Sequence, residues 1–493
     1  MLLIHYVLGV PRLPVFWYDE AFMVEPAWHL ATSGKCISTL LPDIQENPPF
    51  GMNYPLFSLL MAAWIKFFGF NLFAIRLLPF ILMFCGTSIA VAALCRMGVI
   101  RGRMQVLLLL ILWMLTQAAF DASHQARPES LTMLLVAIGL YTSTLGVCTG
   151  AFLGLFLLAA LMPGCGLYMI FPVSIAVVVA LASRAYPIHH ALAVLLGLFV
   201  GSICFYLIYR WTGAWQSFQL VAATVGGLSI AGHLTRILES GELPVTLIQK
   251  SVYWLFSAVL CWACWHRKKS PSCWPIIIAT SGYAAATLLS IGILANFSPW
   301  YGWLCIMPFM VAFVVFAFDC SVIHAWIRGG IMILLILLLL DNNMSRYLSY
   351  SYLLYWCETD SKTVETSLKD VTNRDDVVIG SESAYIALRP NVKKFYSLVY
   401  SSYLMAQAKP IEQVIPGVSA EPITVIIADV SKLHSGLAQP LQQWCGGEWK
   451  EIRISCRQKP AVLRWPPFFP TGADYFECCN YRVFRRVPGP RTY

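Results

Sequence analysis

The chain has 493 residues, of which 58% are hydrophobic and 12% are charged. Soluble domains carry roughly 25% charged residues, so this composition excludes an ordinary soluble protein and indicates a membrane protein. The net charge of +9 does not indicate nucleic-acid binding, because the Lys and Arg residues lie between apolar runs rather than on one amphipathic face.

Apolar runs close to the ~20 residues that cross a bilayer as a helix recur along the chain. Basic clusters between these runs mark the cytoplasmic loops, because positive residues beside spans stay inside. The pattern predicts a cytoplasmic N-terminus without a cleavable signal peptide. Eleven transmembrane helices are expected, near residues 1–17, 74–95, 104–122, 130–147, 150–163, 168–183, 191–209, 252–265, 274–295, 303–320 and 329–341.

The exterior segments are then 18–73, 121–129, 210–251, 296–302 and the tail from about 342. The first of them contains the apolar stretch Tyr54–Phe70. If this stretch crossed the membrane, the basic cluster Arg96–Arg103 would lie outside, so an interfacial or re-entrant helix is predicted there.

The tail differs in composition from the rest of the chain. Charges become frequent after Ser345, and the short apolar stretches Asp376–Gly380 and Thr424–Ala428 are typical of strands. The sequence therefore predicts a transmembrane domain over 1–344 and a small extracytoplasmic α/β domain over 345–493. The short loops favour a bacterial inner membrane, where the exterior side is the periplasm and tail cysteines can form disulfides. An archaeal membrane is the alternative.

Two adjacent carboxylates, Asp19 and Glu20, follow the aromatic residues Phe16, Trp17 and Tyr18 at the predicted outer surface. Partial dehydration raises the pKa of a carboxylate and suits it to proton abstraction. The alternative is an ordinary solvated start of a loop.

Several motifs follow one another in the first part of the chain: Trp17-Tyr18-Asp19-Glu20, Glu46-Asn47-Pro48-Pro49, Gly69, Phe73-Ala74-Ile75-Arg76-Leu77 and Ala126-Arg127-Pro128-Glu129. In this order they resemble the GT-C type of polyprenol-dependent glycosyltransferases, most closely the branch of protein mannosyltransferases and lipid A aminoarabinose transferases. The resemblance covers residues 15–145 well. It rests on span order from 150 to 341, and the tail is only loosely similar.

The resemblance implies a polytopic α-helical enzyme that moves a sugar from a polyprenyl phosphate to an acceptor hydroxyl at the outer face of the membrane. The acceptor would belong to a protein, a lipid or a glycan. Asp19 would be the catalytic general base of an inverting transfer, and Glu20 would orient Asp19 or the acceptor. No cofactor is required by this chemistry.

The donor phosphate needs a cationic partner. Glu46 and Asn47 match substrate-binding positions of the family, but Asn47 replaces the lysine to which the aminoarabinose branch assigns the phosphate. Either another residue binds the phosphate, or the donor differs. Arginine binds phosphate oxygens bidentately, and the candidates are Arg127, Arg76, Arg210 and Arg236. Arg127 is the best placed, in a short outer loop, while interfacial snorkelling is the alternative for Arg76 and Arg210.

A metal site is a further implication of the resemblance, since the aminoarabinose branch joins an acidic residue of the first loop to a histidine of a later one. Glu46 and His233 would be the zinc ligands here. A plain interfacial histidine is the alternative, and His124 is interpreted as a bystander of the site.

Two other classes of function fit a basic multi-span chain. The first is a transporter or lipid-linked sugar flippase, which typically places ionisable groups at the midplane of repeated halves. The second is a non-catalytic scaffold that binds a partner through the tail. The acidic first loop and the lack of visible symmetry favour the enzyme.

Overall fold

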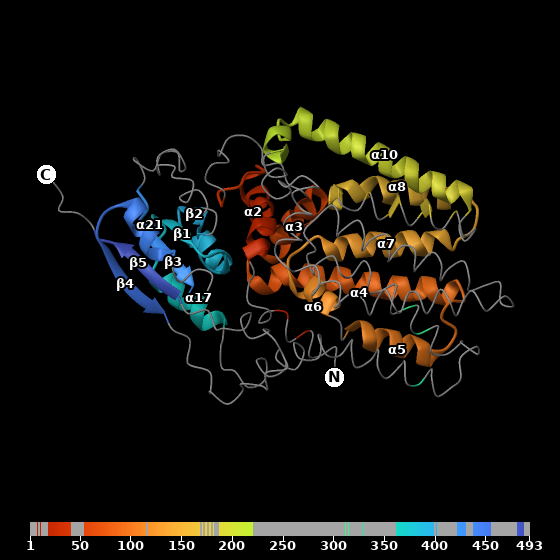
Figure 1. The fold of residues 1–493 in the computed structure, drawn as a ribbon, viewed down its shortest axis with the longest axis horizontal. Coiled ribbons are helices and arrows are strands. Elements are labelled where there is room, and N and C mark those ends of the chain that lie inside the picture. The colour runs from red at the N-terminus through yellow and green to blue at the C-terminus, as the bar shows by residue number, and fades with distance from the viewer. Residues whose placement is uncertain are drawn as a thin grey trace, which may run out of the picture.

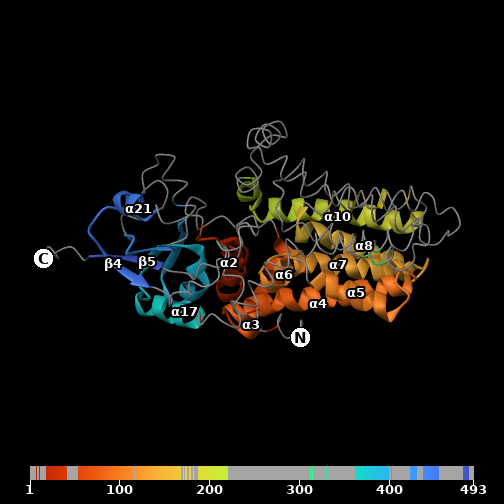
Figure 2. The ribbon, with the colours of Figure 1, turned by 60° about the horizontal axis from the view of Figure 1, so that its bottom comes forward.

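The computed structural model describes residues 18–40, 54–114, 117–167, 187–219, 361–398, 422–429, 437–454 and 481–487, with a few single residues between these ranges. A helical bundle lies at one end of the molecule and a five-stranded sheet at the other (Figure 1). Helices α2, Tyr18–Ser33, and α3, Pro55–Phe68, lie between them. Figure 2 shows the same order along the long axis from a second direction.

The bundle consists of helices that run roughly side by side in Figure 1. They are α4 (Leu72–Arg96), α5 (Arg103–Met114), α6 (Gln117–His124), α7 (Glu129–Ser143), α8 (Thr149–Cys165) and α10 (Ile188–Trp211). Within the described ranges, α4 and α10 are long and apolar enough to cross a membrane. Helices α3, α5, α7 and α8 are apolar but shorter.

The predicted spans 74–95, 130–147, 150–163 and 191–209 correspond to α4, α7, α8 and α10. The predicted span 104–122 instead consists of α5 and α6, which lie on either side of residues 115 and 116. The remaining predicted spans lie wholly or largely outside the described residues. The total of eleven therefore stays a prediction.

Polar side chains begin two of these helices. The Asn71 side chain accepts a hydrogen bond from the Ala74 amide, 2.9 Å away, at the start of α4. The Cys148 sulfur accepts one from the Ala151 amide at the start of α8. Such caps satisfy backbone N–H groups that have no partner inside the helix. Helix α4 ends with Arg96, whose charge is favourable at a helix C-terminus.

One face of α10 is apolar and exposed. Its residues recur every three or four positions and are between 42% and 64% exposed. They are Leu192, Leu196, Phe199, Ile203 and Leu207. A continuous apolar face of this length is unusual on a soluble protein. It suits contact with lipid, as the composition predicts.

Helices α8 and α10 pack through small residues. A Cβ atom at Gly197 would lie 2.3 Å from the carbonyl oxygen of Phe156, and one at Gly201 would lie 2.2 Å from that of Ala160. The two glycines are four residues apart on α10. This is the small-xxx-small arrangement with which membrane helices approach each other closely.

Replacing Gly201 with Ala should separate α10 from α8, because the new methyl group meets rigid backbone. We expect a loss of about 1–3 kcal/mol of stability, as for other overpacked interiors. Thermal unfolding of the protein in detergent would measure it. The matched control is Gly139→Ala on α7, where a Cβ meets nothing within 4 Å. Equal unfolding temperatures for the two variants would contradict the close packing of α10 on α8.

The sheet contains both strands that the sequence predicts. Strands β1 (Val377–Gly380) and β3 (Val425–Asp429) match the two apolar stretches. Strand β1 pairs in parallel with β2 (Lys394–Ser397) on one side and with β3 on the other. Strand β5 (Tyr481–Arg486) pairs antiparallel with β3 and with β4 (Trp449–Ile454). The order is β2-β1-β3-β5-β4, so β2 is an edge strand.

Short helices accompany the sheet. They are α17 (Ser361–Asp370), η3 (Glu382–Ala384), α18 (Tyr385–Leu388), η4 (Arg389–Asn391) and α21 (Ala438–Cys445). Residues 344 and 345, at which the sequence predicts a domain boundary, lie outside the described residues. The sheet and the bundle nevertheless share one hydrophobic core, in which Val378, Tyr385 and Phe395 join Ala21 and Val24 of α2.

Candidate active site

The acidic pair lies in the first turn of α2, a helix that the sequence pattern does not predict. Its 16 residues contain Pro26 and several polar positions, which weaken the helical pattern. The backbone of Asp19 belongs to this first turn, and its side chain lies outside the described residues. A carboxylate in the first turn of a helix is stabilised by the helix dipole.

Glu20 is fully buried and is bound to α4. The Nη2 atom of Arg76 lies 2.6 Å from Oε1 of Glu20, and Nε of Arg76 lies 3.1 Å from Oε2. Neither side chain is exposed. The interpretation of Glu20 as a solvated loop residue is therefore wrong. So is snorkelling of Arg76, because its guanidinium lies in the interior against Glu20.

A third element completes this contact. The backbone N–H of Ala126, in the connection between α6 and α7, donates a hydrogen bond of 2.9 Å to Oε2 of Glu20. The carboxylate thus joins the start of α2, the second turn of α4 and the α6–α7 connection. Two hydrogen bonds from the guanidinium of Arg76 and one from the backbone N–H of Ala126 satisfy the carboxylate of Glu20. Without these partners, burial of its charge would be costly.

Arg127 follows Ala126 directly and is paired with Glu129. Its Nη2 lies 3.0 Å from Oε1 of Glu129, and its Nε lies 3.3 Å from both carboxylate oxygens. Both residues are buried. Glu129 is the first residue of α7, where its charge is favourable. This pair fixes the guanidinium of Arg127 one residue from the contact that holds Glu20.

His124 lies at the end of α6 and is also buried. Its Nδ1 is 2.7 Å from the Ser123 hydroxyl and 3.1 Å from the carbonyl oxygen of Phe120. Its ring stacks on that of Phe120 with 3.9 Å between the centroids. These contacts hold the imidazole ring at the end of α6.

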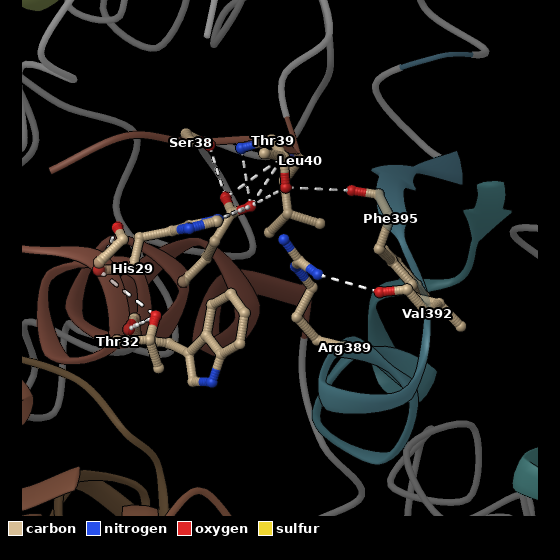
Figure 3. A network of polar contacts seen from close by, with 11 residues as sticks. His29, Thr32, Ser38, Thr39, Leu40, Arg389, Val392 and Phe395 are labelled. Atoms are coloured by element: carbon tan, nitrogen blue, oxygen red, sulfur yellow. Dashed lines mark hydrogen bonds and ion pairs between the residues drawn. The ribbon is translucent and has the colours of Figure 1, made fainter. Parts of the chain in front are cut away.

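A second buried carboxylate of α2, Glu25, is not among the site residues predicted from the sequence. It accepts hydrogen bonds from the segment Ser38–Leu40, close to β2 and η4 (Figure 3). His29 lies beside it, with Nε2 3.6 Å from Oε1. One signal for Glu25 was available in the sequence. It is the third acidic residue within seven positions, and hydrophobic residues lie on both sides of it.

The other predicted site residues are not brought into this cluster by the described part of the chain. Arg210 is exposed in the last turn of α10. Glu46, Asn47, His233 and Arg236 lie outside the described residues. Across the described ranges, no group of three or more His, Cys, Asp or Glu side chains is placed to hold a metal ion.

Solved structures share the fold of this chain, although no match was found from its sequence. No protein-family model matches the chain, and no curated protein matches its sequence. The crystal structure of ArnT from Cupriavidus metallidurans bound to undecaprenyl phosphate is similar, with a TM-score of 0.56 and 14% identity over 87% of this chain and 91% of that one. Its apo state gives a TM-score of 0.52 and 14% identity, over 86% and 90%.

At this identity, the likeness concerns the fold. It confirms the fold that the resemblance implies, so this chain has an ArnT-like fold. The contacts of α2 with α4 and with the α6–α7 connection hold this helix between the bundle and the sheet.

Proposed function

We propose that the protein is a membrane glycosyltransferase that moves a sugar from a polyprenyl phosphate to an acceptor hydroxyl. The fold shared with ArnT, one of whose structures contains undecaprenyl phosphate, supports the lipid-linked donor. The observation that carries the proposal is the buried Glu20–Arg76 pair. This pair holds the first turn of α2, which contains Asp19, against α4. A catalytic group must be held in a fixed position relative to the reacting atoms.

In the proposed reaction, Asp19 is the general base. Its carboxylate takes the proton of the acceptor hydroxyl while the acceptor oxygen attacks the anomeric carbon. The bond from that carbon to the phosphate oxygen breaks, and the polyprenyl phosphate leaves with the bonding electrons. Direct attack from the opposite side inverts the anomeric configuration. The departing phosphate is a stable anion, so the main demand on the protein is to place the acceptor and remove its proton.

Glu20 and Arg76 are proposed to act through position. Arg76 was one candidate for the donor phosphate, but its Nε and Nη2 atoms bind Glu20 in the interior. Arg127 is the proposed phosphate contact, because it lies in the α6–α7 connection next to Ala126. It is also buried and bound to a carboxylate, that of Glu129, so this role requires its guanidinium to bind Glu129 and the donor phosphate together. A guanidinium there would stabilise charge that builds on the leaving phosphate. Glu46, Asn47, Arg210 and Arg236 remain proposed substrate contacts.

The chemistry requires no nucleotide and no step through a metal. Glu46 and His233 are the proposed ligands for zinc, which would act in holding the first exterior segment or the donor phosphate. The active site is proposed to face the non-cytoplasmic side of a bacterial inner membrane, with the sheet on the same side. The acceptor class is a protein, lipid or glycan hydroxyl.

Release of polyprenyl phosphate tests the proposal. The purified full-length protein would be incubated with synthetic undecaprenyl-phosphate pentoses and hexoses, and with bacterial membranes as the source of acceptors. Mass spectrometry of the lipid extract should show undecaprenyl phosphate that is absent with heat-inactivated protein. Movement of intact sugar-lipid across proteoliposomes, without its cleavage, would instead identify a flippase.

A further inference from the structure

Glu25 binds a neighbouring segment of the chain through both carboxylate oxygens. The hydroxyls of Ser38 and Thr39 each donate to it over 2.5 Å. The Thr39 amide donates over 2.7 Å, and the Leu40 amide lies 3.0 Å from Oε1 and 3.2 Å from Oε2. Glu25 itself is fully buried. The segment Ser38–Leu40 is therefore folded back onto α2 around one charge (Figure 3).

The same segment contacts the edge strand of the sheet. The carbonyl oxygen of Leu40 accepts a hydrogen bond of 3.0 Å from the amide of Ser397, the last residue of β2. The Thr39 hydroxyl is 3.4 Å from the carbonyl oxygen of Phe395, a longer contact than the one to Glu25. Edge strands present unpaired backbone groups, and this segment covers part of that edge. Thr39 thus lies between the carboxylate of α2 and β2.

A second contact joins the same two parts. The guanidinium of Arg389, in η4, lies 4.4 Å from the centre of the Trp28 ring on α2. Arg389 also donates to the carbonyl oxygen of Val392, 3.3 Å away. A cation held over an indole ring is an attractive contact, and it is stronger where water is excluded. Arg389 is 8% exposed, so this contact is largely dry.

Helix α2 is consequently held at two levels. Glu20 binds it to α4 near its start, and Glu25 binds it to Ser38–Leu40 and the sheet five residues later. Asp19 lies in the first turn of the same helix. Because a helix moves largely as one body, a displacement of α2 at Glu25 also displaces its first turn, which contains Asp19.

We infer that Glu25 and Thr39 are positioning residues, which clamp α2 to the sheet and so hold Asp19 in place for sugar transfer. The inference rests on the proposed function. It makes the sheet part of the scaffold of the active site, rather than a separable module that only captures the acceptor.

The test uses the full-length protein with the undecaprenyl-phosphate sugar that it accepts. Thr39→Val keeps the shape of the side chain but removes the hydroxyl between Glu25 and β2. We expect kcat to fall roughly tenfold to hundredfold, as for small displacements of reacting groups, with the KM for the donor little changed. Thr39→Ser restores the hydroxyl and should restore most of kcat. The matched control is Thr32→Val, since the Thr32 hydroxyl binds only within α2 at its exposed end, to the carbonyl oxygens of Trp28 and His29.

A readout that does not depend on transfer is the alkylation rate of Cys36, measured by mass spectrometry of its peptide. Burial, with a smaller effect of the Glu25 charge, raises the pKa of the Cys36 thiol to about 12. The thiolate is scarce at neutral pH, so the reaction should be slow. Loosening the clamp with Thr39→Val should speed it roughly tenfold, as expected for a lost bond to a charged group.

The outcomes separate the clamp from its role in catalysis. Unchanged alkylation of Cys36 in Thr39→Val would overturn the clamp. Faster alkylation with an unchanged kcat, or a KM effect in place of a kcat effect, would overturn the positioning role. If the wild-type protein transfers no sugar while Cys36 behaves as expected, the proposed function fails, and the role in catalysis fails with it, but the clamp stands.

Discussion

Replacement of Asp19 by Asn should abolish sugar transfer while leaving expression and membrane insertion intact. The amide has the size of the carboxylate but cannot take the proton of the acceptor hydroxyl. General-base catalysis typically contributes 10²–10⁴-fold, so we expect kcat to fall by roughly that factor. The release of undecaprenyl phosphate would be measured at saturating donor, with the KM for the donor determined in parallel.

Asp375→Asn is the matched control for this variant. Asp375 is exposed in the turn between α17 and β1, so the same chemical change there should leave transfer unaffected. Because Glu20 is already bound to Arg76 and Ala126, it is not expected to replace Asp19 as the base. Full transfer by the Asp19→Asn variant would remove Asp19 from the mechanism and leave the fold assignment untouched.

The sequence predicted those parts of the fold that depend on local composition. Long apolar runs predicted α4 and α10, and the short runs at β1 and β3 predicted strands, because an element that is apolar along its whole length leaves a continuous apolar signal whether it lies in a core or exposes an apolar face. Helix α2 was missed, since Pro26 and its charged residues break that signal. Its helical form depends on packing between the bundle and the sheet.

The candidate site was predicted less completely, because its contacts join residues far apart in the chain. Arg76 was identified as important, but its partner Glu20 lies 56 positions earlier. An arginine in an apolar helix needs a buried partner, yet the sequence does not say which carboxylate supplies it. Glu25 and Thr39 carried no signal of their connection to β2, which lies more than 350 residues further on.

Breaking the Glu20–Arg76 pair should destabilise the protein more than Gly201→Ala does. Arg76→Met keeps the length of the side chain and removes its charge, which leaves the Glu20 carboxylate buried without its guanidinium partner. Removal of one member of a buried pair typically costs about 3–5 kcal/mol. Thermal unfolding in detergent would measure the loss. Arg453→Met is the control, because Arg453 is 77% exposed beside Glu451 and such surface pairs contribute roughly 0–1 kcal/mol.

The double variant Arg76→Met with Glu20→Gln separates stability from position. It removes both charges, so the penalty for an unpaired buried carboxylate disappears, and we expect much of the lost stability to return. Sugar transfer should not return with the stability. The bidentate ion pair that holds the first turn of α2, with Asp19, against α4 is absent from this variant. If the double variant regains both stability and kcat, the pair only stabilises the fold. If it regains stability alone, the pair holds the base in the geometry that the reaction requires.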